Sequence, residues 1–206
     1  MAVLIVDYGM GNLASVQRAL EILGHESFIS KDPADVARAR QVILPGVGSF
    51  RQAMENLTNS GWAAALRDTV VTKKIPLLGI CLGMQLLADE GFEDGHSAGL
   101  GLVPGSVKRF DQDSSGKLRI PHVGWNEIHF NAVNDPLFTG LADKMDFYFV
   151  HSYCFNTTTP EATLAVTPYG VNFSSVVRNG LVWGTQFHPE KSGPAGAKIL
   201  KNFLTI

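Results

Sequence analysis

The chain has 206 residues and a formal net charge of −2, without the Lys or Arg runs typical of nucleic-acid-binding proteins. Its two cysteines, Cys81 and Cys154, are too few for a disulfide framework and favour a reducing compartment. No apolar run approaches the roughly 20 residues of a membrane span, so we expect a cytoplasmic protein that contacts neither membrane nor nucleic acid.

The first half of the chain alternates strand and helix signals. A buried apolar run at 3–9 is followed by helical spacing of leucine and valine over 12–24, and Gly24 ends that helix. Strands alternating with helices imply a parallel sheet covered on both faces. The later elements of this half are a strand at 41–50, a helical stretch from Ser49 to Lys73 interrupted at Gly61, a strand at 75–81 and a helix at 82–89.

After about residue 104 the pattern changes to strands with little helix between them. Asn179-Gly180 separates two apolar runs and is the strongest hairpin signal in the chain. We therefore predict an α/β fold with one domain over 1–206, in which a mostly parallel sheet gains antiparallel strands in its C-terminal half. The predicted elements are an exposed turn at 111–116, strands at 146–154, 162–167, 174–180 and 181–190, and a closing helix at 195–204.

One strand-to-helix junction carries a thiol between glycines. Gly79-Ile80-Cys81-Leu82-Gly83 has the form of a nucleophile elbow with Cys in place of Ser. Small neighbours allow a tight turn, and a helix N-terminus favours the thiolate. The backbone N–H of Leu82 would face developing negative charge. Free cysteine is also a common small core residue, so the motif alone leaves both interpretations open.

Two other strand ends supply groups that a thiol nucleophile needs. The loop Pro45-Gly46-Val47-Gly48 can turn N–H groups toward a ligand and complete an oxyanion hole, although it is also compatible with an ordinary turn. His188 and Glu190 share one side of an extended chain, so the carboxylate can fix the imidazole tautomer. Many His-x-Glu pairs are simply surface residues. Cys81 and His188 lack close ligand-spaced neighbours, so we predict no metal site.

A dinucleotide-binding fingerprint competes with this interpretation. Residues 9–14 fit G-x-G-x-x-A after the first strand, and Asp32 follows at nearly the expected distance. Asp7, however, places an acid close to where a pyrophosphate would lie, and the chain lacks a second mononucleotide-binding half. We therefore do not expect a nicotinamide cofactor, and no other cofactor is indicated.

Three segments together resemble the class-I (triad) glutamine amidotransferases: "PGVGSF", "GICLGMQLL" and "FHPEK". The resemblance covers essentially the whole chain. Within the family the chain is most similar to the imidazole glycerol phosphate synthase branch, from histidine biosynthesis. Branches serving anthranilate or GMP synthesis usually carry His where this chain has Met84, and Ser or Thr where it has Lys191. The histidine branch is further indicated by "VDYGMGNL", "PHVGWN" and "YFVHSY".

The resemblance implies a flavodoxin-like fold and a glutaminase without a cofactor. Cys81 would attack the side-chain amide of L-glutamine, His188 would act as general acid and base, and Glu190 would orient His188. The oxyanion would be held by the Leu82 N–H and by the Gly46, Val47 and Gly48 loop, which must turn an N–H rather than a C=O toward the pocket. Substrate-binding residues would be Gln85, Ser152 and Tyr153.

The resemblance also implies a heterodimer with a cyclase subunit, a (β/α)8 barrel that receives the ammonia. Aromatic residues in strands are commonly packing residues, and this remains the alternative for Trp125 and Tyr148. The docking face implied by the family comprises Gly11, Asn12, Trp125, Asn126, Tyr148 and Lys191.

Other functions remain open from the sequence. The same chemistry could serve another acceptor, such as chorismate in anthranilate synthesis or a nucleotide. A non-catalytic binding protein of the same fold would carry a degenerate triad, which the presence of all three residues disfavours. A cysteine peptidase is the remaining alternative, and Gln85 beside the elbow argues against a peptide substrate.

Overall fold

Parallel strands form the first part of a large sheet. The structure is a computed structural model that describes residues 2–110 and 118–206, so the turn predicted at 111–116 lies outside the described residues. The central strands β1, β3 and β4 are rich in buried aliphatic residues, as expected where both faces are covered. The order across the sheet is β2 (Ser27–Ser30), β1 (Ala2–Val6), β3 (Ala39–Gly46), β4 (Leu77–Cys81) and β14 (Val182–Thr185).

The C-terminal half extends this sheet with mainly antiparallel strands. β14 pairs with β13 through a tight hairpin in which Asn179 lies opposite Val182, and Gly180 has a φ of 58°. The predicted hairpin is therefore confirmed. Beyond β14 the order is β13 (Val171–Asn179), β11 (Tyr153–Thr157), β7 (Gly105–Arg109), β5 (Glu90–Gly91) and β6 (Ser97–Ala98). Off this path, β12 (Thr163–Tyr169) pairs with β13, and β9 (His129–Phe130) pairs with β12.

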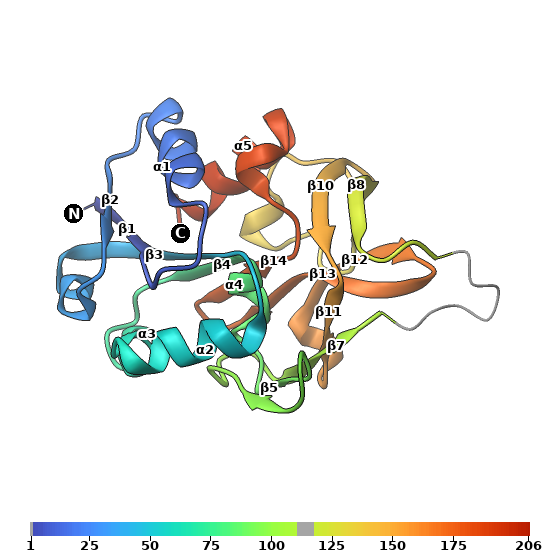
Figure 1. The fold of residues 1–206 in the computed structure, drawn as a ribbon. Coiled ribbons are helices and arrows are strands. Elements are labelled where there is room, and N and C mark those ends of the chain that lie inside the picture. Colours follow the sequence, from blue (N-terminus) through green and yellow to red (C-terminus); the bar gives the residue numbers. More distant parts are fainter. Residues whose placement is uncertain (1, 111–117) are drawn as a thin grey trace.

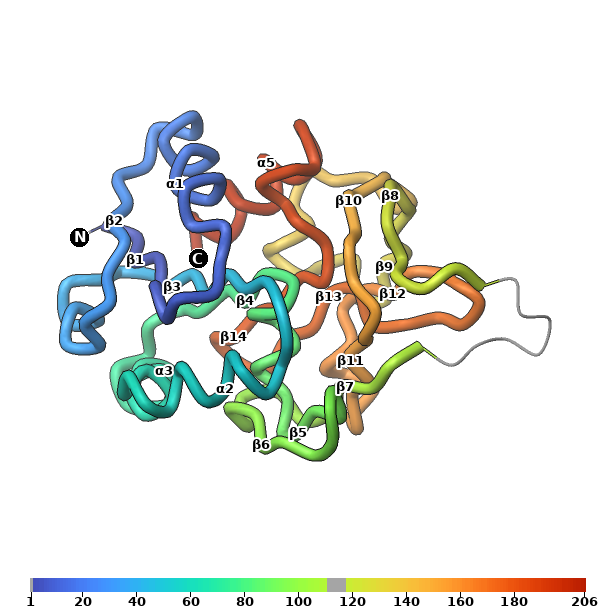
Figure 2. The backbone as a smooth tube through the Cα atoms, in the orientation of Figure 1, coloured from blue at the N-terminus to red at the C-terminus, as the bar shows by residue number. Residues whose placement is uncertain are grey.

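A separate two-stranded ribbon was not predicted. β8 (His122–Glu127) and β10 (Asp146–His151) pair antiparallel, with His122 opposite His151. Figure 2 shows the two strands side by side, at the end of the molecule away from β2. The single strand predicted at 146–154 is wrong, because the chain breaks at Ser152 and continues as β11 in the main sheet.

Helices cover both faces of the parallel strands, as predicted (Figure 1). α1 (Leu13–Ile22) and α5 (Gly193–Phe203) pack on one face with Val3 and Ile5, while α2 (Phe50–Asn59) and α3 (Trp62–Val71) pack on the other with Leu4 and Val6. Gly61, with a φ of 82°, separates α2 from α3, which confirms the predicted interruption. Short 3-10 turns complete the fold: η1 (Pro33–Arg38), η2 (Pro136–Phe138), η3 (Pro160–Ala162) and η4 (Pro189–Lys191).

Two predicted elements near the site are shorter than expected. The helix predicted at 82–89 is the four-residue α4 (Leu82–Gln85), and residues 82–88 are buried on every side. The strand predicted at 181–190 ends at Thr185, after which the chain turns into η4. Within the described ranges no helix combines the length and hydropathy needed to cross a bilayer.

Candidate active site

Cys81 lies at the C-terminal end of β4 in a backbone conformation that non-glycine residues rarely adopt. Its φ is 55° and its ψ is −111°, and α4 begins at the next residue. Strained conformations of this kind concentrate at functional sites, where the surrounding packing holds them in place. The thiol is 7% exposed, and it lies 3.8 Å from the carbonyl oxygen of Val150. The elbow predicted from the flanking glycines therefore forms.

The glycines allow the elbow to pack tightly against its neighbours. A Cβ on Gly83 would lie 1.8 Å from the carbonyl oxygen of Leu44, and one on Gly79 would lie 2.6 Å from the carbonyl oxygen of Gly83. Both obstacles are backbone atoms, which cannot rotate away. The glycines are thus required by the close approach of β3, β4 and α4.

Replacing Gly83 with alanine should destabilise the chain by roughly 3 kcal/mol, because the new methyl group forces β3 and α4 apart. Gly180→Ala is the matched control: its Cβ would meet no atom within 4 Å, so only the strain of a positive φ remains, about 1 kcal/mol. Urea unfolding of both variants measures the difference. Equal losses would show that the elbow accommodates a side chain.

His188 and Glu190 form a buried pair beside the elbow. The ring Nδ1 donates to the Oε1 of Glu190 at 2.8 Å, and their side chains are 3% and 1% exposed. Among the described residues, Nε2 of His188 has no hydrogen-bond partner. The carboxylate therefore fixes the tautomer and leaves Nε2 for chemistry.

The protonation of His188 is set by these neighbours. Burial lowers the pKa of His188, but its interactions with Cys81 and Glu190 outweigh burial and raise the pKa to about 9. The imidazolium is consequently the dominant form at neutral pH. A protonated His beside a cysteine thiolate is the arrangement that a cysteine nucleophile and its general acid require.

The pair forms through a different local geometry from the one predicted. Glu190 lies in the 3-10 turn η4, and His188 precedes that turn rather than ending an extended strand. Pro189 starts the turn, which brings the two side chains together. The Ser192 hydroxyl closes the turn by donating to the His188 carbonyl at 2.6 Å, and it accepts from the N–H of Tyr148 on β10 at 3.0 Å. Ser192 was not predicted from the sequence.

A cavity of about 300 Å³ opens directly above Cys81. It brings the three predicted strand ends together, and the exposed Val47 and Gly48 form one side of its mouth. Gly46 lies beneath this side, paired with Cys81 across β3 and β4. The lining consists of Val47, Gly48, Cys81, Leu82, Gln85, Glu93, Pro121, Val150, His151, Ser152, Tyr153 and His188.

Gln85 is held rigidly in this cavity. Its Nε2 donates to the carbonyl oxygen of Tyr153 at 2.9 Å and to the Oε1 of Gln186 at 3.0 Å. Both amide hydrogens are thus engaged, and the side-chain oxygen remains available as an acceptor. The carbonyl oxygen of Ser152 already accepts from the N–H of Phe110 at 3.1 Å.

Sequence reasoning missed two polar residues of the site. Gln186 is fully buried, and its Nε2 lies 3.8 Å from the Sγ of Cys81. The sequence feature that could have indicated Gln186 is a polar side chain directly after a strand of buried residues. Glu93 lines the cavity and accepts from the N–H of Phe50 at 2.7 Å. Burial and the nearby Asp94 raise the pKa of Glu93 despite that hydrogen bond.

Most residues predicted for docking lie together on or beside the β8–β10 ribbon. Trp125 is 58% exposed and packs edge-on against Tyr148 at 6.0 Å, and Lys191 lies 6.0 Å from the Tyr148 ring. Trp125 is paired with Tyr148 and Val123 with Val150, so one face of the ribbon carries four apolar or aromatic residues. We call Val123, Trp125, Tyr148 and Val150 the ribbon face.

The remaining predicted docking residues lie elsewhere, before α1. A Cβ on Gly11 would approach Pro45 at 3.5 Å, so this loop lies against the start of the loop at 45–48. Asn12 is exposed. The first loop therefore contacts the loop at 45–48 directly and has an open outer surface.

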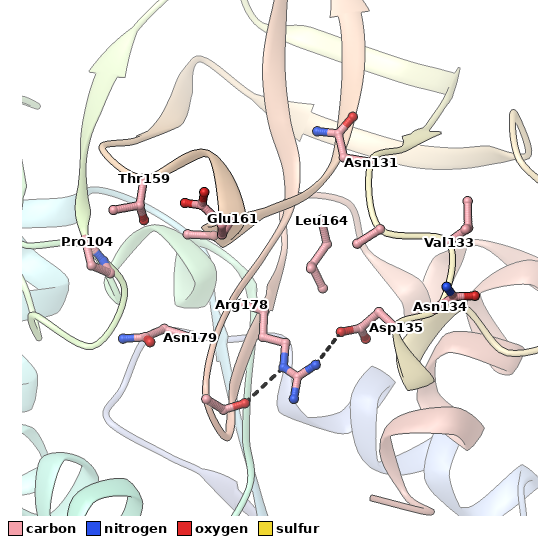
Figure 3. Close-up of a pocket in the computed structure, with 13 residues that line it drawn as sticks. Pro104, Asn131, Val133, Asn134, Asp135, Thr159, Glu161, Leu164, Arg178 and Asn179 are labelled. Carbon is pink, nitrogen blue, oxygen red and sulfur yellow. Dashed lines mark hydrogen bonds and ion pairs between the residues drawn. The ribbon is translucent and has the colours of Figure 1, made fainter.

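A cavity larger than the candidate site lies elsewhere in the described part of the chain. It measures about 830 Å³ and lies between β13, η3 and the segment before η2. Figure 3 shows Arg178 and Asp135, two of the residues that line it, joined by a dashed line, and their atoms lie 2.7 Å apart. Trp183 also donates to Asp135 at 3.3 Å. This cavity contains no thiol or imidazole, and within the described ranges no group of three metal-binding side chains occurs.

The chain matches known proteins over almost its full length. The family described as glutamine amidotransferase class-I matches residues 4–206. The imidazole glycerol phosphate synthase subunit HisH of Chlorobium chlorochromatii is 49% identical over 205 residues, covering 99% of this chain and 100% of its own. Subunit HisH 1 of Campylobacter jejuni is 45% identical over 202 residues, covering 98% of each chain.

Solved structures show the same fold. A glutamine amidotransferase crystal structure matches with a TM-score of 0.76 at 21% identity, covering 99% of this chain and 98% of its own. The structure of PurLQS from Thermotoga maritima matches with a TM-score of 0.77 at 21% identity, covering 99% and 97%. The resemblance drawn from three short segments is thereby confirmed: the chain belongs to the class-I glutamine amidotransferase family.

Proposed function

We propose that the chain is the glutaminase subunit of an imidazole glycerol phosphate synthase. It hydrolyses L-glutamine to glutamate and passes the ammonia to a cyclase subunit. The observation that carries the proposal is the meeting of Cys81 with the buried His188–Glu190 pair at one cavity. The relatives named above support the choice of pathway, because they are nearly half identical over almost their full length.

The site supports a two-step reaction through a thioester. The Cys81 thiolate attacks the side-chain amide carbon, and the carbon–nitrogen bond breaks as the His188 imidazolium gives its proton to the leaving ammonia. His188, now neutral, then takes a proton from water, and the resulting hydroxide cleaves the thioester to glutamate and regenerates the Cys81 thiolate beside the imidazolium. Glu190 keeps the reactive Nε2 directed away from itself through both steps.

The oxyanion formed in each step needs donors that are already in place. Leu82 begins α4, so its N–H has no acceptor within the helix, and Leu82 lines the cavity. We propose this N–H as the first donor. The second donor would come from the loop of Gly46, Val47 and Gly48. Removing one such donor typically costs about 10²–10³ in kcat.

The far end of the cavity suits the α-amino acid part of glutamine. The Glu93 carboxylate and the free oxygen of Gln85 are both acceptors, and an α-ammonium group needs acceptors. Backbone groups of Ser152 and Tyr153 would hold the α-carboxylate. The cavity of about 300 Å³ accommodates a small amino acid rather than a folded peptide substrate.

The ribbon face supports docking to a partner. An exposed tryptophan beside a tyrosine is typical of interface anchors. We propose that a (β/α)8 cyclase binds here, with contributions from Gly11, Asn12, Asn126 and Lys191, and that the heterodimer functions in the cytoplasm. The cyclase would use the ammonia to convert a phosphoribulosyl-formimino-AICAR phosphate intermediate to imidazole glycerol phosphate and AICAR.

Replacing Trp125 with aspartate should lower the affinity for the cyclase subunit by at least about tenfold, because it puts a charge in an apolar contact. Glutamine-dependent formation of imidazole glycerol phosphate should fall in parallel at limiting partner concentration. Val133→Asp is the matched control, since Val133 is 66% exposed and lies beside the large cavity instead. Unchanged affinity of the Trp125 variant, or failure of the wild-type chain to support glutamine-dependent synthesis, would contradict the proposed function.

A further inference from the structure

Two buried histidines lie between the ribbon face and the glutamine cavity. His122 on β8 and His151 on β10 are 3% and 7% exposed, and the Nδ1 of His122 lies 3.1 Å from the Nε2 of His151. His151 also lines the cavity above Cys81. Neither histidine has a role in the glutaminase reaction as proposed.

The surrounding groups fix the direction of every hydrogen bond in this pair. The Nδ1 of His151 lies 2.8 Å from the carbonyl oxygen of Tyr153, which can only accept, so Nδ1 carries the proton and Nε2 accepts from His122. The Nε2 of His122 then accepts from the Nδ2 of Asn126 at 3.3 Å. Burial lowers the pKa of His122 to about 4 and, with smaller contributions from His122 and His188, that of His151 to about 3. Both rings are therefore neutral at pH 7, as this arrangement requires.

From His151 the series of hydrogen bonds continues inward to Cys81. The carbonyl oxygen of Tyr153 accepts from His151 and also from the Nε2 of Gln85 at 2.9 Å. Gln85 donates in turn to Gln186, whose own amide nitrogen lies 3.8 Å from the sulfur of Cys81. A continuous series of polar contacts thus runs from Asn126 to Cys81.

The outer end of this hydrogen-bond series is Asn126, which lies on β8 beside Trp125. Asn126 uses its second amide hydrogen on the carbonyl oxygen of Pro168 at 3.0 Å, and its side-chain oxygen accepts from the N–H of Glu127 at 2.9 Å. The amide has no unused group and cannot turn without breaking a bond. Asn126 and His122 both lie on β8, so a displacement of β8 moves them together and must alter their contacts with other strands, those of Asn126 with Pro168 on β12 and of His122 with His151 on β10.

The aromatic packing around His122 leaves little room to absorb such a displacement. Its ring stacks on Tyr169 with centroids 3.9 Å apart and on Phe149 at 4.9 Å, while Phe173 lies edge-on at 5.8 Å. Close-packed interiors transmit strain rather than dissipate it. His122 is thus held between two rings and connected at both nitrogens.

We propose that His122 and His151 are positioning residues that couple occupancy of the ribbon face to the glutamine cavity. When a partner shifts β8, Asn126 and His122 move with it, the contact of His122 with His151 on β10 changes, and the change reaches the Tyr153 carbonyl that holds Gln85. The inference rests on the proposed function. Coupling of this kind is reciprocal: if the partner changes the affinity for glutamine, glutamine changes the affinity for the partner by the same factor.

We call the series of polar contacts from Asn126 to Cys81 the relay. Two substitutions at His122 each remove one hydrogen bond of the relay. His122→Asn keeps a donor near the Nδ1 position for His151 and loses the acceptor used by Asn126. His122→Gln reaches the Nε2 position and keeps only the Asn126 contact. Tyr169→Phe is the matched control, because it retains the stacked ring and removes only a hydroxyl bonded to the carbonyl oxygen of Arg119.

The test measures kcat/KM for glutamine in the isolated chain and in the complex with its cyclase subunit. Both His122 variants should lose at least about tenfold of the stimulation by the partner, while partner affinity and Cys81 labelling of the isolated chain by a glutamine-like diazo-ketone stay within about threefold of wild type. Tyr169→Phe should retain full stimulation. If one His122 variant fails to fold, as judged by thermal unfolding, the other carries the same test.

Stimulation within twofold of wild type in the folded His122 variants would overturn the relay. So would a loss of partner affinity equal to the loss of stimulation, because that result would assign His122 to docking alone. These failures leave glutamine hydrolysis by the wild-type complex intact. A wild-type complex that hydrolyses no glutamine would instead overturn the proposed function, and the relay with it.

Discussion

Replacing Cys81 with alanine should abolish glutamine-dependent synthesis by the complex while leaving ammonia-dependent synthesis unchanged. No other thiol lines the cavity, so the thioester cannot form. In proteases whose nucleophile has been removed, kcat falls by roughly 10⁶, and a loss of about 10⁴ or more is expected here. The cyclase does not need Cys81 when ammonium salts supply the nitrogen directly. Formation of imidazole glycerol phosphate with each nitrogen source measures both effects.

Cys154→Ala is the control for this substitution. Cys154 is buried in β11 and removed from the cavity lining, so its loss should spare both activities apart from a moderate loss of stability. Parallel loss of ammonia-dependent synthesis in the Cys81 variant would refute the proposed division of labour between the two subunits. Retention of glutamine-dependent synthesis would remove Cys81 from the mechanism.

The parts of the site that local sequence specifies could be predicted. Gly79 and Gly83 flank Cys81 because β3 and α4 approach too closely for any side chain, and short-range signals of this kind are visible in one sequence. The hairpin at Asn179-Gly180 belongs to the same class. The contact between His188 and Glu190 was expected in an extended chain but forms in a 3-10 turn that Pro189 starts.

Features that depend on tertiary pairing could not be predicted. The run "DFYFVHSYC" alternates continuously, yet its two halves join different sheets at Ser152. The alternation of apolar and polar residues indicates which side chains are buried, but it does not indicate which strand pairs with which. The four-residue α4 was overestimated for a related reason, since an apolar run buried on every side shows no helical face. His122 and His151 are 29 positions apart, and a lone histidine carries no local signal.

The second large effect is expected at Glu190, the partner of His188. Glu190→Gln should lower kcat/KM for glutamine by roughly 10²–10⁴, because an amide can donate to Nδ1 and so favour the wrong tautomer of the imidazole. The same change removes one of the two interactions that raise the pKa of His188. The variant therefore differs from wild type in pH dependence as well as in rate.

The sign of the pH effect follows from the role of His188 as proton donor. His188 is protonated below its pKa of about 9, so wild-type activity is present below that pH and is lost as the pH rises through it. The free energy of unfolding depends on pH with the same sign. The interactions of protonated His188 stabilise the fold fully below the unfolded pKa of about 6.5, and this stabilisation is lost as the pH rises through about 9. In Glu190→Gln the alkaline decline should move to lower pH.

Profiles of kcat/KM for the complex between about pH 6 and 10 measure the shift in the alkaline decline. Glu161→Gln is the matched control, since Glu161 is exposed beside the large cavity and the same atoms are exchanged there. An alkaline decline that stays in place while the rate falls would contradict the assignment of that decline to His188. It would leave Glu190 with a purely geometric role, holding the ring in place without setting its charge. A shift of the alkaline decline together with a loss of rate would show that the Glu190 carboxylate both orients the His188 ring and raises its pKa. The 2.8 Å contact of Glu190 with Nδ1 leads us to expect this result.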